Sequence, residues 1–387
     1  MKTMKTMLAA LLAAVLLLSL AACHPANETA VTVGDTQVPA GIYLCALIQA
    51  DGEGRNKVDS AKAAESTDST ASTTSGSSTA TEIDYYDEKI DDTDFTKWVK
   101  DYAMKIVTEY AVYTDLFNKA GLKLDEATLK EIDSAVDYYW NTYGYSEIYE
   151  PNGVSFASYK EFYTYTYRVR EYFMSIYGEG GAKEIAADEL NKAISDNFAV
   201  AKVLTVSYNT TDSDGKTTTL SDDEIQAIKD RVATYGPKLE GGESFKKLYL
   251  TEHPETSENT TETKTDADEN TTTDYCSIFV SEAAQPFCSS QYYSYEYFEE
   301  VKALQVGKAY TAHNTDDNYS VVLYKAQDVL SYTDYQDSLK ETAMYILKQE
   351  EFEADVQTII DGTKVSTNDY AIDRFKPKNI EYPVGAA

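Results

Sequence analysis

Apolar residues recur at helical spacing through the first half of the chain. The clearest run occupies residues 95–117, where aromatic and aliphatic side chains return every three or four positions ahead of Gly121. The same periodicity marks three further segments, residues 129–140, 158–176 and 183–196. Ser158 and Glu161 have the spacing of a capping box at the start of one of them. The pattern therefore predicts a helical domain over residues 83–197.

The pattern changes from helical to alternating after this block. Residues 198–208 (FAVAKVLTVSY) and 319–324 (YSVVLY) alternate and are rich in β-branched side chains, which is typical of strands. Between them, Ser221 and Glu224 have capping-box spacing ahead of a short helix. We therefore predict a small α+β domain over residues 198–330.

The two ends of the chain supply the remaining apolar segments. Residues 31–38 alternate about a Gly-Asp turn, which indicates a strand pair, and a short apolar run follows them. An amphipathic helix is predicted over residues 333–361, and its apolar stripe would be exposed if it stood alone. We expect residues 23–50 and 331–387 to pack with the helical domain. The predicted fold class is α+β, a discontinuous helical domain with a small inserted α+β domain.

Two polar segments interrupt these domains. Residues 51–82 are rich in Ser, Thr, Ala and Gly, and residues 254–274 are rich in Thr, Glu, Asp and Asn. Neither holds enough large apolar side chains to offset the conformational entropy that is lost on ordering. Both are therefore predicted to be disordered insertions.

The first 23 residues have the pattern of an export signal. Lys2 and Lys5 precede an uncharged apolar stretch at residues 7–20, which is too short for a transmembrane anchor. The following Ala-Ala-Cys23 resembles a bacterial lipobox, which implies removal of residues 1–22 and a diacylglycerol on the Cys23 sulfur. An ordinary signal-peptidase site with a chance cysteine is the alternative. We expect an extracytoplasmic protein that is anchored to the bacterial cell membrane by lipid at Cys23.

Charge and composition restrict the partners and the chemistry. The 34 basic and 65 acidic residues give a net charge of −31, which argues against nucleic acid and anionic lipid surfaces as partners. The three histidines are scattered and no cysteines have zinc spacing, so we expect no metal site and no cofactor. Cys45 lies in an apolar run and is predicted to be a core residue, whereas Cys276 and Cys288 could form a disulfide.

Tyrosine is unusually frequent, with 33 residues against two tryptophans. The rings gather in residues 159–167 and 292–298, where they could line a cradle for unfolded segments or stack on sugars. They could equally pack helix on helix with their hydroxyls at the rim. If a cradle exists, its predicted client-binding residues are Trp140, Tyr163, Tyr167 and Phe173.

Several short motifs follow one another in a characteristic order. They are the opening residues 31–39, Val203-Leu204, Gly242 to Phe245, Leu304 to Lys308 and the strand at 318–323. This order resembles the PrsA/SurA-type extracytoplasmic foldases, which combine a helical chaperone domain with a parvulin peptidyl-prolyl isomerase domain. The resemblance implies a helical chaperone-like domain with an inserted parvulin-like domain over residues 198–330.

The positions that carry catalysis in that family are altered in this chain. Its two histidines align with Lys202 and Ser320, and the acidic or cysteine partner would fall after Leu248. A protonated lysine donates hydrogen bonds but accepts none, and serine is shorter than histidine, so neither replaces a neutral imidazole. The resemblance therefore implies a parvulin-like scaffold with little or no isomerase activity.

Together these patterns predict a lipid-anchored chaperone or foldase that binds unfolded or nascent exported polypeptides. An active peptidyl-prolyl cis-trans isomerase with displaced catalytic residues is the first alternative. The second is a ligand-binding lipoprotein of a transporter, although the repeated strand–helix units of such proteins are missing here. A hydrolase is disfavoured, because the abundant carboxylates form no recognisable pair or triad.

Overall fold

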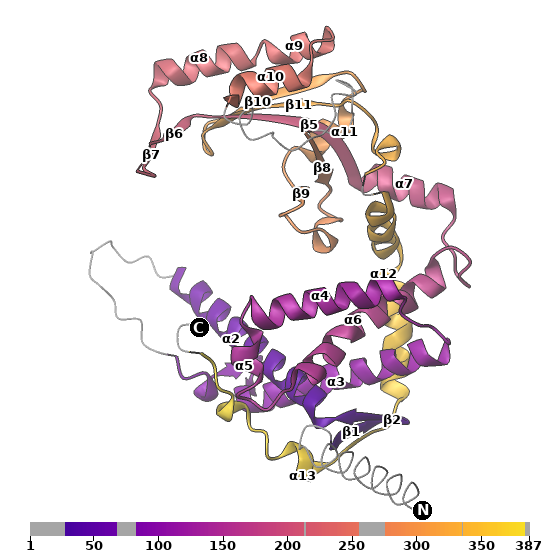
Figure 1. Cartoon of the computed structure of the whole chain (residues 1–387). Coiled ribbons are helices and arrows are strands. Elements are labelled where there is room, and N and C mark those ends of the chain that lie inside the picture. The colour runs from indigo at the N-terminus through magenta and orange to yellow at the C-terminus, as the bar shows by residue number, and fades with distance from the viewer. Residues whose placement is uncertain (1–27, 68–82, 213, 255–274, 335, 384–387) are drawn as a thin grey trace, which may run out of the picture. The chain divides into compact units, whose positions relative to one another are not determined.

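A computed structural model gives the fold of the chain (Figure 1). It describes residues 28–67, 83–212, 214–254, 275–334 and 336–383. The predicted signal peptide and Cys23, residues 68–82 of the first predicted insertion and residues 255–274 of the second lie outside this described part.

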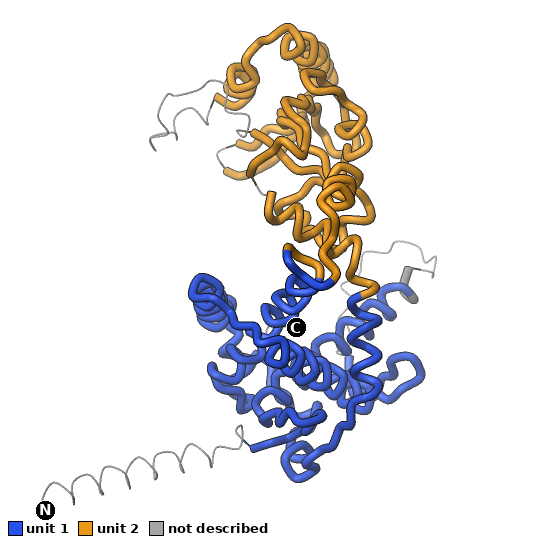
Figure 2. Tube along the Cα trace, turned by 90° about the vertical axis from the view of Figure 1, so that its right-hand side faces the viewer, with its two compact units in different colours: residues 1–176, 180–182, 352–387 blue, residues 177–179, 183–351 orange. Residues whose placement is uncertain are grey.

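The chain forms two compact units, coloured separately in Figure 2. Unit 1 comprises residues 1–176, 180–182 and 352–387, and unit 2 comprises residues 177–179 and 183–351. Helices dominate unit 1, whereas unit 2 combines a five-stranded sheet with short helices. The predicted fold class, α+β with a discontinuous helical domain and an inserted α+β domain, is therefore confirmed.

Unit 1 is a helical body with a small sheet at its edge. The antiparallel sheet has the order β12-β1-β2 and joins the two ends of the chain. Its strands are β1 (Thr29–Val33), β2 (Thr36–Pro39) and β12 (Val365–Thr367). The helices are α2 (Ala40–Thr67), α3 (Phe95–Lys119), α4 (Glu126–Asn141), α5 (Tyr145–Tyr149), α6 (Phe156–Tyr177), the C-terminal part of α12 (Gln336–Gly362) and α13 (Asp369–Ile372).

Helix α2 corrects one prediction. It continues without a break through residues 51–67, so the prediction that residues 51–82 are wholly disordered was wrong for this part. A Cβ atom added to Gly54 would lie 3.0 Å from Cε2 of Phe95, so the missing side chain lets α2 approach α3 closely. Close helix contact therefore orders a segment that has few large apolar residues.

A polar cluster links α2 to the C-terminal tail within unit 1. It consists of Asp51, Arg55, Tyr85, Tyr86 and Tyr382, and we call it the Asp51 cluster. Asp51 is fully buried; its Oδ2 accepts hydrogen bonds from Arg55 Nε at 2.6 Å and from the Tyr382 hydroxyl at 2.8 Å. The Arg55 guanidinium lies 4.6 Å from the ring centroid of Tyr85 and 4.7 Å from that of Tyr382. The buried charges are thus paired, and the guanidinium is stacked on aromatic rings.

Aromatic packing joins the C-terminal part of α12 to the earlier helices of unit 1. Phe352 is buried, and its ring meets Phe173 edge to face with centroids 5.2 Å apart. Tyr113 and Tyr172 pack on the same ring, at 5.8 and 6.0 Å. The C-terminal part of the apolar stripe of α12 is therefore covered by α3 and α6.

The N-terminal part of this stripe, with Leu339 and Ala343, packs in a core of unit 2 instead. The predicted domain bounds were thus wrong for residues 183–197 and 331–351, which belong to unit 2.

Unit 2 is built on one sheet with the strand order β10-β11-β5-β8-β9, antiparallel except for the β8–β9 pair. Its elements in this sheet are β5 (Phe198–Ser207), β8 (Cys276–Val280), β9 (Tyr293–Ser294), β10 (Ala309–Asn314) and β11 (Tyr319–Tyr324). Strands β6 (Asn209–Thr211) and β7 (Thr217–Thr219) form a separate hairpin. The helices are α7 (Ala187–Asn197), α8 (Asp222–Val232), α9 (Tyr235–Glu240), α10 (Phe245–Glu252) and α11 (Phe298–Ala303), together with the N-terminal part of α12.

The two faces of this sheet are covered differently. Leu204 and Val322 point to one face, where helices α8 to α10 complete a core cluster (Figure 1). Val321 and Leu323 point to the other face, where α11 supplies Phe298 and Val301. Alternation along β5 and β11 therefore assigns each residue of these strands to one of the two faces.

Only one of the two predicted capping boxes forms. Glu224 Oε2 accepts a hydrogen bond from the Ser221 backbone N–H at 2.9 Å at the start of α8, as predicted. Ser158 lies inside α6, and its own N–H donates to the Ser155 hydroxyl instead. Glu161 pairs with Arg168 at 2.7 Å, so its carboxylate is not a cap.

None of the helices in the described residues is both long enough and apolar enough to cross a membrane.

Candidate binding groove

Unit 1 contains a groove of about 640 Å³ that is lined by α2 to α6 and by the C-terminal tail. Eight tyrosines line this tyrosine groove: Tyr102, Tyr139, Tyr145, Tyr149, Tyr159, Tyr163, Tyr165 and Tyr382. Ile48, Ile106, Ile148 and Phe162 add apolar surface. Such a volume is in the range of ligand-binding sites, and half of the lining residues are aromatic.

Helical spacing on α6 places the central rings of the groove. Tyr159, Tyr163 and Tyr167 follow one another at intervals of four, and their neighbouring ring centroids are 6.4 and 5.9 Å apart. Tyr139 from α4 reaches across to Tyr163, with centroids 5.8 Å apart. The rings form a connected aromatic surface, and each carries a hydroxyl that can hydrogen-bond to a ligand.

Besides the hydroxyl groups, the polar side chains that line the groove are carboxylates and uncharged amides. Glu53 and Glu109 contribute carboxylates, Gln49 and Asn56 contribute amides, and no lysine or arginine is among the groove-lining residues that the structure describes. Burial raises the pKa of the Glu109 carboxyl, an effect that Lys105 partly offsets. The groove therefore combines aromatic rings with carboxylates that attract cations.

Three tyrosine hydroxyls of the groove, those of Tyr149, Tyr159 and Tyr165, remain protonated at neutral pH. Burial raises the pKa of Tyr165 to about 12 and raises the pKa of Tyr149 and Tyr159 further still. Each hydroxyl can therefore donate as well as accept a hydrogen bond. None of these groups is activated as a nucleophile or a general base.

The four predicted client-binding residues fall in different places. Tyr163 lines the tyrosine groove, and Tyr167 lines an adjoining hollow together with Glu131 and Arg170. Trp140 and Phe173 are buried in the core and line neither of these two hollows, so the prediction that they line a groove was wrong. The sequence missed the contributions of α2 and of Tyr102, because only tertiary packing brings them opposite α6.

In unit 2 the two positions that align with the family's histidines lie on neighbouring strands but not opposite each other. Ser320 pairs with Val206 across β11 and β5, whereas Lys202 pairs with Tyr324. This offset of four residues along the strands corresponds to about 13 Å. Both residues point to the sheet face that helices α8 to α10 cover, so they share no open catalytic site.

Ser320 is fully buried in a small hydrogen-bond network. Its hydroxyl lies 2.6 Å from the Tyr208 hydroxyl and 2.8 Å from Nδ1 of His313. The His313 pKa is lowered, chiefly by desolvation and also by the nearby Lys229. These contacts satisfy groups that would otherwise be buried without partners, which is a structural role.

Replacement of Ser320 by alanine is expected to destabilise unit 2 by about 1–3 kcal/mol, because the buried Tyr208 hydroxyl loses its partner. Hydrogen exchange of the β5 and β11 amides measures this change. Ser331→Ala, at an exposed serine of the same unit, is the control and is expected to alter exchange very little. Unchanged exchange in Ser320→Ala would contradict the structural role.

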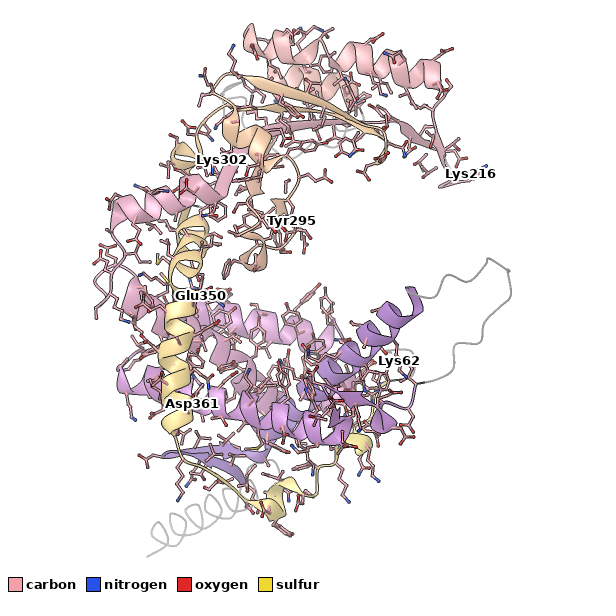
Figure 3. All side chains as sticks on the ribbon, turned by 180° about the vertical axis from the view of Figure 1, so that it is seen from behind. Lys62, Lys216, Tyr295, Lys302, Glu350 and Asp361 are labelled. Carbon is pink, nitrogen blue, oxygen red and sulfur yellow. The ribbon has the colours of Figure 1, made fainter. Side chains whose placement is uncertain are left out.

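The other sheet face of unit 2 carries its own hollow, of about 400 Å³. Val203, Val321 and Leu323 form an apolar floor, and the tyrosine-rich segment that includes Tyr295, labelled in Figure 3, forms a wall. Tyr297 in this wall has φ +62°, an uncommon conformation for a residue with a side chain. No histidine, cysteine or arginine of the described residues lines this hollow.

The remaining predicted chemistry concerns thiols and metals. Cys45 is buried, as predicted for a core residue, and Cys288 is a buried thiol that forms no disulfide with Cys276. Burial raises the pKa of the Cys288 thiol to about 11. Within the described residues, no group of His, Cys, Asp and Glu side chains has the arrangement of a metal site.

Comparison with known proteins gives a distant structural likeness. No protein-family model and no curated protein matches the chain. Among solved structures the chain is similar to the foldase protein PrsA from Streptococcus pneumoniae, with 14% sequence identity and a TM-score of 0.36. The match covers 66% of this chain and 80% of that chain.

Proposed function

We propose that this protein is an extracytoplasmic chaperone that binds unfolded segments of exported polypeptides in the tyrosine groove of unit 1. The observation that carries the proposal is the groove itself, which is lined by eight tyrosines and by apolar side chains. Its hydroxyls are ordinary donors and acceptors, so its chemistry is that of binding rather than catalysis.

Tyrosine suits a site that must accept many sequences. The ring offers a large contact area at little cost in side-chain entropy, and the hydroxyl adapts its hydrogen bonds to the ligand. The rings at Tyr139 and Tyr163 are half-buried rather than sealed in the core, so they can contact a segment lying in the groove. Contacts of this kind are broad and weak, as a chaperone that must release its clients requires.

The proposal includes a lipid anchor at Cys23 and an extracytoplasmic location. Both rest on the apolar stretch and the Ala-Ala-Cys sequence at the start of the chain. A tether of this kind would hold the groove near the membrane where exported chains emerge.

We further propose that unit 2 is a parvulin-like scaffold that has lost its isomerase activity. The resemblance in motif order supports the scaffold. The lysine and serine at the aligned positions, both facing the helix-covered side of the sheet, support the loss of activity. Under this proposal unit 2 has a structural role and no catalytic role.

Two assays on the mature chain test the proposal together. The protein is expected to suppress the aggregation of a chemically denatured client. It is also expected to leave the cis/trans isomerisation of a Xaa-Pro peptide uncatalysed, with a relaxation time of tens to hundreds of seconds. No suppression would overturn the chaperone function, and clear acceleration would instead favour the active isomerase.

Substitution of groove tyrosines is expected to weaken client binding. The double variant Tyr139→Ser/Tyr163→Ser removes two facing rings, and about tenfold more protein should then be needed for the same suppression. The control is Tyr292→Ser/Tyr370→Ser, which removes two tyrosines that are 71% and 79% exposed and lie outside the groove. Equal loss in both double variants would show that the groove is not the binding site.

A further inference from the structure

We propose that the tyrosine groove selects client segments that carry lysine or arginine beside apolar residues. This inference deepens the proposed chaperone function and rests on it, because it states which part of an unfolded polypeptide occupies the groove. Its basis is the charge of the lining and the way in which unit 1 binds its own cations.

The lining is complementary to a cation. Glu53 and Glu109 are the charged residues among the described side chains that line the groove, and both are acidic. Glu53 is exposed on α2, whereas Glu109 is half-buried on α3, so the carboxylates come from two different walls. A cation that enters between them would also lie over tyrosine rings, whose faces attract positive charge.

Lys105 makes a contact of this kind with two groove-lining residues, Tyr102 and Glu109. Its ammonium nitrogen lies 6.0 Å from the ring centroid of Tyr102 and 3.8 Å from Oε1 of Glu109. Both of these partners line the groove, whereas the Lys105 side chain is 62% exposed. A basic side chain of a client would use the same kind of ring and carboxylate, with less competition from water deeper in the groove.

The Asp51 cluster repeats the arrangement in the interior of unit 1. There the Arg55 guanidinium lies between the rings of Tyr85 and Tyr382 and pairs with a buried carboxylate. Tyr382 also lines the tyrosine groove. This unit therefore already holds one arginine with tyrosine rings and a carboxylate, the chemistry that we assign to the groove.

Charged residues beside the groove indicate where a basic side chain of a client would bind. The adjoining hollow contains Arg170 together with Glu131, so it presents both signs of charge. Glu161 does not line the groove and is paired with Arg168. The cation is therefore expected between Glu53 and Glu109, not at the Tyr167 end of α6.

The test compares two fluorescent peptides on the full mature chain. One contains two arginines among leucine and phenylalanine residues, and the other carries citrulline, a neutral isostere, in place of each arginine. The arginine peptide is expected to bind about five- to tenfold more tightly at low salt, and the ratio should shrink as ionic strength rises. Fluorescence anisotropy gives both dissociation constants.

Variants that neutralise the two groove carboxylates test whether these residues cause the preference for arginine. Glu53→Gln/Glu109→Gln should remove the preference for arginine, so that the arginine and citrulline peptides bind this variant with equal dissociation constants. The control Glu126→Gln/Glu150→Gln removes the same charge from two exposed residues of unit 1 outside the groove, and it should keep the preference.

The outcomes separate this inference from the proposed function. Equal binding of the two peptides to the unaltered chain would overturn the preference for cations and leave the chaperone function standing. Binding of neither peptide, together with failure to suppress aggregation, would overturn both. A preference that persists in Glu53→Gln/Glu109→Gln would place the cation site elsewhere and would also overturn the inference.

Discussion

Replacement of Asp51 by alanine is expected to destabilise unit 1 by about 3–5 kcal/mol, because it leaves the Arg55 guanidinium without its carboxylate partner in the interior. The Tyr382 hydroxyl loses the same acceptor, so the C-terminal tail is also released from α2. Asp51 is fully buried and the Arg55 side chain is 23% exposed, so water compensates little for the lost pair. This makes Asp51 one of the most sensitive positions in the chain.

Tryptophan fluorescence during urea unfolding measures this loss within unit 1. The only two tryptophans, Trp98 and Trp140, both lie in unit 1, so the signal is specific to it. Asp101→Asn is the matched control, because Asp101 forms an exposed pair with Lys97. Exposed pairs contribute about 0–1 kcal/mol, so the control should unfold nearly as the parent does. Similar midpoints for Asp51→Ala and the parent would contradict the role of the Asp51 cluster.

Replacement of Phe352 by alanine is expected to cost about 3–5 kcal/mol in the same assay. Phe352 packs on Phe173, Tyr113 and Tyr172, so its loss opens a cavity between α12 and the earlier helices. The effect should appear in the tryptophan signal although residue 352 follows unit 2 in the sequence, because unit 1 is discontinuous.

The control for this substitution lies on the same helix. Ile359 is 41% exposed, so Ile359→Ala removes a large apolar side chain from α12 without opening a core cavity. Its expected cost is below about 1 kcal/mol. Equal losses for the two substitutions would show that the C-terminal part of α12 does not complete unit 1.

The sequence predicted the periodic helices and the alternating strands well, because each is marked by its own apolar pattern. Strand β11 has the predicted bounds Tyr319–Tyr324, and α3 begins at Phe95 as its apolar pattern does. The second half of α2 was missed for a physical reason. It is ordered by the close approach at Gly54 and by the buried Asp51, and neither a glycine nor an aspartate contributes to a hydrophobic pattern.

The candidate site was predictable only in part. The tyrosine cluster at residues 159–167 drew attention to Tyr163, which lines the groove, but aromatic character alone cannot separate groove residues from core residues such as Phe173. The residues that α2 adds to the groove are far from α6 in sequence, so only the folded chain shows them together.

The alternation of side chains along a strand explains why the sequence could not tell which sheet face Lys202 and Ser320 occupy. Neighbouring residues of a strand face opposite sides of the sheet, so an alignment that shifts by one residue changes the face. Lys202 faces the helix-covered side, whereas Val203 lines the hollow on the opposite side. A linear motif cannot tell which of these two faces is open.

Site-specific photo-crosslinking tests the central claim, that the tyrosine groove holds unfolded clients, most directly. A crosslinking amino acid at Asn56, an exposed groove residue, is compared with one at Leu330, which is 45% exposed in unit 2. We predict that denatured client is captured at position 56 far more than at position 330, and that the same client in its native state is captured at neither. Equal capture at both positions, or capture of native and denatured client alike, would contradict the account.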